Sequence, residues 1–363
     1  MDWLVSNLGS ISWQMAVMWI IGGVLIFLAI KKDMEPTLLL PMGLGAILVN
    51  LPEWGALKEL QILYDAGIET ELFPLLLFIG IGAMIDFGPL LSNPKLLLCG
   101  AAAQFGIFFT LSMARLFGFQ LEDAASIAII GAADGPTSIF VAKYFQTGYL
   151  GAIIVAAYSY MALVPIVQPP FIKLVTTKKE RRMRMEYNPA NISRTTRILF
   201  PILVTFIAGI AAPKSVALVG FLMFGNLLRE CLVLNSLSET AQKVLANLVS
   251  LLLGLSVAPV MVAEKFLVPQ TLMILGLGLV AFIFDTIGGV IFVKILNLFL
   301  KNKINPMVGA AGISAFPMSS RVVHKMGLKE DPQNFLLMHA AGANVAGQVA
   351  SVIAGGMIIS LIG

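Results

Sequence analysis

The chain has 363 residues, of which 58% are hydrophobic and 12% are charged, and its formal net charge is +4. Soluble domains carry about 25% charged residues, whereas here the apolar residues form runs of roughly 20, the length of a helix that crosses a bilayer. The composition excludes an ordinary soluble domain and predicts an all-α polytopic membrane protein.

Six apolar elements precede a polar linker and six follow it. The first half has them at 13–30, 37–52, 71–92, 95–118, 124–145 and 149–172, and the second half at 197–212, 214–232, 244–262, 269–299, 305–325 and 333–361. The N-terminus has no basic lead and no small-residue cleavage site. We therefore expect the first element to be a retained span rather than a signal peptide.

The linker, 173–197, carries eight Lys or Arg and two Glu. A basic run can indicate nucleic-acid binding, but beside two membrane spans it is more typical of a topology determinant on the cytoplasmic side. We therefore predict a cytoplasmic linker and no nucleic-acid partner. The linker separates a first membrane repeat, 1–172, from a second membrane repeat, 198–363.

The two halves share landmarks at a nearly constant offset. Asn50 ends the segment LPMGLGAILVN and Asn226 ends VGFLMFGN, an offset of 176. The segment GAADGPTS begins at Gly131 and GAAGISAF begins at Gly309, an offset of 178. Each match is weak, but their common order and spacing predict an internal structural repeat.

The charge pattern predicts how the repeats are related. If all six elements of each half crossed the bilayer, the basic linker would share a side with the acidic loops at 53–71 and 122–123, against the positive-inside rule. If the fifth element of each half re-enters on its own side, the basic loops gather on one side and the halves are inverted. We predict two inverted structural repeats, each with about five spanning helices plus a re-entrant or broken helical element.

Asp134 lies within the apolar fifth element of the first half, in GAADGPTSIF. Gly135 and Pro136 follow it and should break the helix, because proline has no N–H and restricts the residue before it. Backbone that leaves a helix within a bilayer must line protein or water. A carboxylate there costs about 2.5–3.5 kcal/mol unless it is paired. We therefore expect a cation to pair with Asp134.

The corresponding part of the second half offers neutral oxygen ligands. It contains Asn305 and Ser314 in NPMVGAAGISAFPMSSR and Asn344 in GANVAGQVAS. Hard cations favour oxygen ligands, and two histidines and two cysteines are too few and too scattered for a zinc or copper site. Sodium or proton coupling follows. A lone intramembrane Ser or Tyr usually bonds a neighbouring helix, but the repeat-related placement of Ser314 and Tyr160 favours ligand roles.

Other polar residues admit two readings. Asp285, in FIFDTIGGV, is a second carboxylate within a span and either pairs with a neighbour or lies on the ion path. Asp86 and the Arg229–Glu230 pair are expected to be structural. His324 and His339 are expected to be packed or interfacial, although His339 could relay protons. Cys99 and Cys231 are expected to be small buried residues without a disulfide.

The segments GAADGPTSIF, SYMALVPIVQPP, NPMVGAAGISAFPMSSR and GANVAGQVASVIAGG closely resemble the beta subunit of the sodium-translocating biotin-dependent decarboxylases, which act on oxaloacetate, methylmalonyl-CoA or glutaconyl-CoA. The resemblance implies a membrane subunit of a primary sodium pump. Such a subunit decarboxylates carboxybiotin delivered by a partner and couples this reaction to sodium export with inward proton movement.

Matched residue by residue, the resemblance implies these site residues. Asp134, Asn305, Gly309 and Asn344 would lie at a sodium site, Tyr160 and Ser314 at a second sodium or proton position, and Arg321 at the cytoplasmic mouth where carboxybiotin enters. Catalytic roles would fall on Asp134, Tyr160 and Arg321, and contact with the carboxybiotin on Arg321 and Asn305.

The resemblance also implies a setting for the chain. The partners would be a carboxyltransferase (alpha) subunit, a biotin carrier subunit and a small membrane anchor subunit. The chain would form a homo-oligomer, a trimer, in the inner (plasma) membrane of a prokaryote. The acyl substrate is selected on another subunit, so this chain does not specify it.

One alternative shares the same architecture. A secondary sodium- or proton-coupled transporter of an organic anion would also have an inverted repeat and a midplane carboxylate. Repeat architecture does not fix chemistry, so only the family motifs favour the pump. A passive membrane anchor is disfavoured, because an anchor has no use for a costly buried carboxylate.

Overall fold

The computed structural model describes residues 7, 9–187 and 191–363, and within them the secondary structure is helical, without strands. The first half contains α2 (Trp13–Lys32), α3 (Pro36–Val49), η1 (Pro52–Trp54), α4 (Leu57–Tyr64), η2 (Asp65–Glu69), α5 (Leu72–Met84), α6 (Gly88–Ser92), α7 (Leu96–Ala102), α8 (Phe105–Leu116), α9 (Leu121–Ala128), η3 (Ile129–Ala132), α10 (Gly135–Tyr144) and α11 (Leu150–Val175).

The linker contributes one short helix, and the second half has the remainder. These elements are α12 (Lys178–Arg181), α13 (Arg194–Ala211), η4 (Pro213–Ser215), α14 (Val216–Glu230), α15 (Asn235–Thr240), η5 (Ala241–Leu245), α16 (Ala246–Ser256), η6 (Ala258–Met261), α17 (Ala263–Phe266), α18 (Pro269–Phe299), α19 (Met307–Ala310), α20 (Met318–Glu330) and α21 (Leu337–Ile362).

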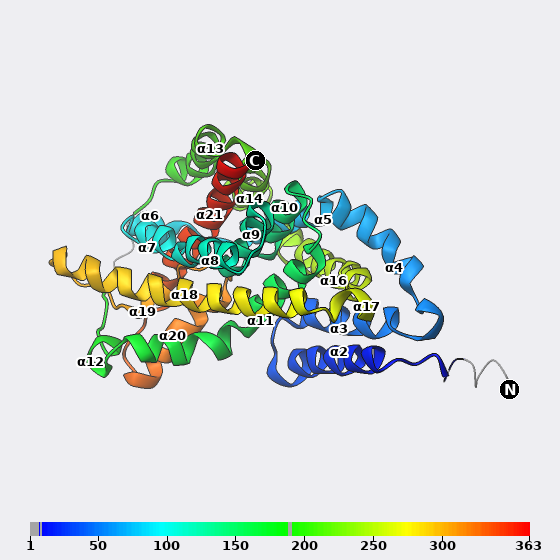
Figure 1. Ribbon diagram of the computed structural model, residues 1–363. Helices are drawn as coiled ribbons and strands as arrows, with labels where there is room; N and C mark the ends of the chain where they lie inside the picture. Colours follow the sequence, from blue (N-terminus) through cyan, green and yellow to red (C-terminus); the bar gives the residue numbers. More distant parts are fainter. Residues whose placement is uncertain (1–6, 8, 188–190) are drawn as a thin grey trace.

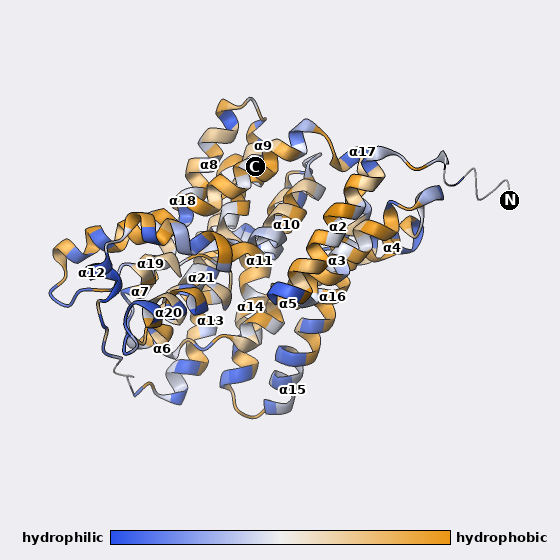
Figure 2. Ribbon diagram, turned by 90° about the horizontal axis from the view of Figure 1, so that it is seen from below, coloured by the Kyte–Doolittle hydropathy of each residue, from blue (hydrophilic) through white to orange (hydrophobic). Residues whose placement is uncertain are grey.

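The long apolar helices fit a membrane protein. Among the described residues, seven helices are long and apolar enough to cross a bilayer, or eight if the bent pair Leu57–Glu69 and Leu72–Met84 forms one span. Figure 2 shows these helices as mainly hydrophobic, whereas hydrophilic residues gather around α12 and α20 and at the ends of helices. The prediction of an all-helical membrane protein is confirmed.

Most predicted elements appear with shifted boundaries. The predicted 71–92 element ends as a helix at Met84 and restarts as α6, and the predicted 244–262 element starts earlier, at Asn235. Both predicted fifth elements are interrupted. The first breaks between η3 and α10, and the second breaks between α19 and α20. A broken fifth element in each half is therefore present, as the glycines and prolines there predict.

The two halves are interleaved rather than stacked side by side. Helix α3 of the first half packs on α16 of the second, and α14 of the second packs on α5 of the first. In the same way α11 packs on α18, and α21 packs on α7. Figure 1 shows α18 running along α11 across the middle of the molecule. Contacts exchanged in this way are those expected of two repeats related by a twofold axis.

Two asparagines at equivalent positions form hydrogen bonds that join one half of the chain to the other. The Asn50 side chain donates to the carbonyl of Met261, at 2.9 Å, and the Asn226 side chain donates to the carbonyl of Ile85, at 2.9 Å. The pairs Asn50–Asn226 and Ile85–Met261 are each separated by 176 residues, so one half's contact is mirrored by the other's. Both asparagines are almost fully buried and tie the end of a helix to the opposite half.

Candidate functional site

The break in the first half places a carboxylate at the start of a helix. Ala133 adopts a left-handed conformation, with φ at 51°, and Asp134 then caps the N-terminus of α10. Pro136 occupies the first turn of α10, where no N–H is needed. The carboxylate of Asp134 accepts the backbone N–H of Thr137 at 3.2 Å. The local sequence therefore ends one helix, starts another and places an acid beside the free amides in the first turn of α10.

Asp134 is only 3% exposed, and neutral side chains surround it. The hydroxyl of Thr137 donates to Asp134 Oδ2 at 2.8 Å. From α21, Ser351 Oγ donates at 2.7 Å and Gln348 Nε2 at 3.1 Å. Gln348 and Ser351 are three residues apart and so lie on one face of α21. The acid thus joins the broken element of the first half to the last helix of the second.

No ion pair among the described residues involves Asp134. Its partners are hydroxyl and amide groups, and these also carry oxygens that can bind a cation once a hydroxyl rotates or the amide turns over. The set of Asp134, Thr137, Gln348 and Ser351 therefore offers one carboxylate and three neutral oxygens. This donor set fits a monovalent hard cation such as sodium.

The break in the second half meets the first. The backbone N–H of Ser314 donates to the carbonyl of Ala132 at 3.0 Å, which joins the irregular segments of the two halves directly. Ser314 Oγ donates to Gly347 O on α21 at 3.2 Å. Asn344 Nδ2 donates to Ile313 O at 2.6 Å, and its buried Oδ1 has no hydrogen-bond partner among the described residues. An unpartnered buried oxygen beside the junction is available to a cation.

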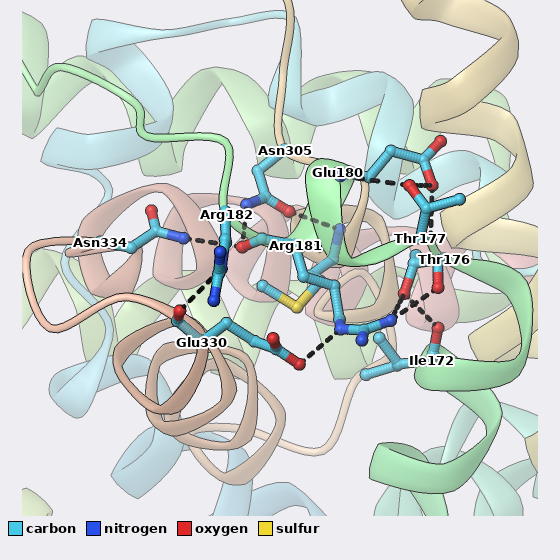
Figure 3. Close-up of polar contacts among 10 residues, drawn as sticks. Ile172, Thr176, Thr177, Glu180, Arg181, Arg182, Asn305, Glu330 and Asn334 are labelled. Atoms are coloured by element: carbon cyan, nitrogen blue, oxygen red, sulfur yellow. Dashed lines mark hydrogen bonds and ion pairs between the residues drawn. The ribbon is translucent and has the colours of Figure 1, made fainter.

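Three predicted site residues are used elsewhere in the structure. The Tyr160 hydroxyl donates to the carbonyl of Leu275, and its ring packs among apolar side chains of α9, η3, α11 and α18. Asn305 donates its side-chain amide to the carbonyls of Arg181 and Met183 in the linker (Figure 3). Gly309 lies at a helix crossing, where a Cβ would come within 2.0 Å of the Gly289 carbonyl oxygen. Through these contacts the three residues position the backbone and the packed helices. That they bind a cation directly stays a prediction.

A tyrosine that the sequence did not single out lies nearer the carboxylate. The ring of Tyr158 packs against Gly135, where a Cβ would come within 2.2 Å of the ring. The Tyr158 side chain is fully buried, and its hydroxyl has no hydrogen-bond partner in the part of the chain that the structure describes. Only glycine fits beneath this ring, so the residue after Asp134 is determined by Tyr158.

Arg321, on α20, lines a groove. The groove has a volume of about 430 Å³. Its charged lining consists of Lys32, Asp33, Lys173, Arg321, Lys325, Lys329 and Glu330. Five cations against two acids suit an anionic ligand, and the apolar side chains of Met318, Val322 and Met326 suit its uncharged part. Burial raises the pKa of the nearby Glu35, while Arg321 opposes this shift.

Several other expectations concern residues away from Asp134. Asp86 and Glu230 each contact Arg197 and Arg229 at 3.4–3.8 Å, which supports structural roles for these charged residues. His339 packs edge-on against the Tyr187 ring. Burial lowers the pKa of His324 in α20, which keeps that imidazole neutral at physiological pH.

Thr137, Gln348 and Ser351 contact Asp134, yet the sequence reasoning did not select them. A signal for two of them existed, since Asn344, Gln348 and Ser351 follow one another at spacings of four and three on one helix face. The spacing alone did not reveal that this face would meet Asp134, because Gln348 and Ser351 follow Asp134 by 214 and 217 positions in the sequence.

The sequence matches known proteins over nearly its whole length. The family model described as Na⁺-transporting oxaloacetate decarboxylase beta subunit matches residues 14–362. The chain is 47% identical to a methylmalonyl-CoA decarboxylase subunit beta of Veillonella parvula, over 96% of this chain and 93% of the relative. It is 46% identical to a glutaconyl-CoA decarboxylase subunit beta of Acidaminococcus fermentans (99% and 96%). It is 43% identical to an oxaloacetate decarboxylase beta chain 2 of Salmonella typhi (96% and 95%).

Proposed function

Because this chain belongs to the family of beta subunits of Na⁺-transporting decarboxylases, we propose that it is the sodium-translocating subunit of a biotin-dependent decarboxylase. In this proposal it releases carbon dioxide from carboxybiotin delivered by a partner and couples the release to sodium export and inward proton movement. The observation that carries the proposal is the buried Asp134 carboxylate, which is surrounded by neutral hydroxyl and amide groups on two helices from opposite halves.

Asp134 is suited to exchange one cation for another. With sodium bound, the hydroxyls of Thr137 and Ser351 turn their lone pairs toward the ion and the carboxylate supplies the negative charge. With a proton bound, the acid is neutral and the same hydroxyls donate or accept as required. One group that holds either ion, but not both, couples the two fluxes.

The junction of the two broken elements supplies the means of changing access. The Ser314 N–H bond to Ala132 and the Asn344 bond to Ile313 join irregular backbone from both halves beside the acid. Short irregular segments of this kind rearrange at less cost than continuous helices. We propose that the halves are inverted repeats whose relative movement exposes Asp134 to one side of the membrane and then to the other.

The cationic groove of Arg321 is the proposed entry for the carboxylated group. Arg321 holds the carboxylate by a charge-assisted bond, and the lysines around it raise the local concentration of an anion. Met318, Val322 and Met326 contact the apolar rings that carry the carboxylate. The biotin itself is carried by the partner. When its carboxylate leaves as carbon dioxide, the electron pair of the broken N–C bond stays on the biotin nitrogen, which takes up the proton that has moved inward.

The proposed setting follows from the same family. The chain assembles with a carboxyltransferase (alpha) subunit, a biotin carrier subunit and a small membrane anchor subunit, and forms a homotrimer. It lies in the inner (plasma) membrane of a prokaryote, with the basic linker in the cytoplasm. The positive charge of the linker and of the groove on α20 supports this orientation.

The test reconstitutes the complex in liposomes and follows radioactive sodium uptake and carbon dioxide release together after acyl substrate is added. In the wild type both signals are expected to require sodium and biotin. In Asp134→Asn both are expected to fall at least about a hundredfold, because a neutral amide cannot alternate between the two cations. The amide still caps α10, so the variant should fold.

Asp86→Asn serves as the matched control, since it makes the same chemical change in an acid paired with Arg197 and Arg229. It should retain most of both signals. Carbon dioxide release without sodium dependence in the wild type would contradict the pump. Anion uptake by this chain alone would favour the secondary transporter instead.

A further inference from the structure

Part of the basic linker is docked against the second half rather than free in solvent. Arg181, in α12, is only 6% exposed. Its guanidinium donates to Glu330 Oε1 at 2.7 Å and to the Thr176 carbonyl at 2.6 Å (Figure 3). A buried arginine is costly unless it is paired and hydrogen-bonded, and the contacts with Glu330 and Thr176 offset that cost.

The backbone of the same residue is held from the opposite side. The carbonyl of Arg181 accepts from Asn334 Nδ2 at 2.8 Å and from Asn305 Nδ2 at 3.2 Å, and Asn305 also donates to Met183 O at 2.8 Å (Figure 3). Asn305 Oδ1 in turn accepts the N–H of Met307, at the start of α19. The linker is therefore fixed to both helices that flank the break in the second half.

Glu330 connects this docked segment to the groove of Arg321. It is the last residue of α20, and it lines the groove together with Lys329 and Lys325. The other acid in the lining is Asp33, and Glu35 lies close enough to interact with Arg321. Hydrogen bonding to Arg181 holds the pKa of Glu330 below its usual value, so the acid is ionised at neutral pH. An uncompensated charge there would repel a carboxylate.

We propose that Arg181 is a positioning residue for the anionic ligand of the groove. Its guanidinium neutralises Glu330, so that the groove presents its five cations to a carboxylate, and its carbonyl fixes the linker to Asn305 and Asn334. The inference rests on the proposed function only in naming carboxybiotin as that anion. It gives Asn305 a role through the linker that needs no direct contact with sodium.

A double-mutant cycle separates the charge effect from simple bracing. The complete complex, without acyl substrate, is assayed for carbon dioxide release as a function of the concentration of added free carboxybiotin. Arg181→Gln is expected to raise KM by roughly tenfold with little change in kcat, because the free charge of Glu330 then opposes binding. Arg181→Gln combined with Glu330→Gln is expected to return KM to within about twofold of the wild type.

Two further variants make the result decisive. Arg184→Gln is the matched control, because Arg184 belongs to the same segment and pairs with Asp331 at 2.7 Å, but neither residue lines the groove. Its KM should not change. Arg181→Lys keeps the charge and covers the case in which Arg181→Gln does not fold. Its KM should stay within about threefold of the wild type.

The proposal is overturned if the double variant is as impaired as Arg181→Gln, since the arginine would then act only as a brace. An equal rise in KM for Arg184→Gln would also overturn it, because the effect would then belong to the charge of the whole linker. Sodium dependence is measured in the same wild-type preparation. Its absence would contradict the pump, while the cycle on KM would still test the charge balance of the groove.

Discussion

Two buried carboxylates, Asp134 and Asp285, each lie against the N-terminus of a helix that begins inside the apolar part of the molecule. Asp134 caps α10, and Asp285, on α18, accepts backbone N–H groups of Gly106 and Ile107 in the first turn of α8. Neither takes part in an ion pair within the part of the chain that the structure describes. Both exploit the unpaired amides and the positive end of a helix dipole.

Their surroundings differ in what can move. The neighbours of Asp134 are side chains with rotatable hydroxyl and amide groups. Asp285 is enclosed by backbone, because a Cβ at Gly106 would lie 2.5 Å from Oδ1 and a Cβ at Gly131 would lie 2.9 Å from Oδ2. A carboxylate that exchanges ligands needs neighbours that reorient, whereas one that fixes backbone needs close packing. We therefore interpret Asp134 as the ion-binding acid and Asp285 as the acid that holds its scaffold.

The largest expected effect that tests this comparison is on stability. Asp285→Ala removes the acceptor of two amides in α8 and leaves a cavity, so it should lower the free energy of unfolding by about 2–5 kcal/mol. Asp285→Asn keeps one acceptor oxygen and should cost less than half as much. Unfolding in detergent, followed by helical circular dichroism, measures both.

The Asn variant also tests the function of Asp285. If Asp285→Asn folds normally but loses sodium-dependent carbon dioxide release, then Asp285 lies on the ion path and the contrast with Asp134 is wrong. If sodium dependence survives in this variant, the scaffold role stands.

Gly131 lies between the two acids and provides the next test. A Cβ there would lie 2.7 Å from the Ala281 Cβ and 2.9 Å from Asp285 Oδ2. Gly131→Ala should therefore destabilise the protein by about 1–3 kcal/mol through overpacking. Gly276→Ala, on α18, is the control, because a Cβ there has nothing within 4 Å and alanine favours a helix. Equal melting temperatures for the two variants would show that the crossing is loosely packed.

The sequence predicted the features that follow from local chemistry. Gly135 and Pro136 break the fifth element of the first half, and the apolar runs mark the long helices. Both signals can be read from residues that are close together in the sequence. The common offset of Asn50 and Asn226 indicated a repeat, and these residues make equivalent contacts. The inverted orientation of the halves stays a prediction.

The groups that surround Asp134 could not be predicted from the sequence, because they depend on which helix faces pack together. Ser351 reaches Asp134 from a position 217 residues away. Tyr158 rather than Tyr160 faces the segment beside Asp134, and the two differ by little more than half a turn of α11. The docking of Asn305 on the linker depends on the path of a polar segment that has no periodic pattern to reveal it.

A smaller effect should appear at the rotatable neighbours of Asp134. Ser351→Ala removes one hydroxyl that donates to the acid at 2.7 Å and should raise the sodium concentration for half-maximal activity by about threefold to tenfold. The fold should change little. Ser360→Ala is the control, because that hydroxyl bonds to the Gly356 carbonyl on the same helix. Identical sodium curves for the Ser351 and Ser360 variants would remove Ser351 from the ion site.

The smallest expected effect concerns Glu330. Unlike Asp134 and Asp285, this acid forms an ion pair within the described residues, with Arg181. Its pKa is lowered from 4.5 chiefly by the hydrogen bond from Arg181. A lowered pKa in the folded state means that the pair stabilises the protein above pH 4.5, and that this contribution disappears as the pH falls through the lowered value. Desolvation of the Glu330 carboxylate opposes the effect of the hydrogen bond from Arg181, so the net contribution that disappears with falling pH should be about 1 kcal/mol.

The difference in unfolding free energy between the wild type and Glu330→Gln, measured from pH 7 to pH 3, should therefore be constant near neutrality and vanish at the acid end. Glu239→Gln removes an acid from an exposed pair with Lys243 and should give a smaller difference at every pH. A difference for Glu330 that grows toward low pH would reverse the sign of the linkage. It would mean that Arg181 does not favour the ionised acid, and the charge balance proposed for the groove would fail with it.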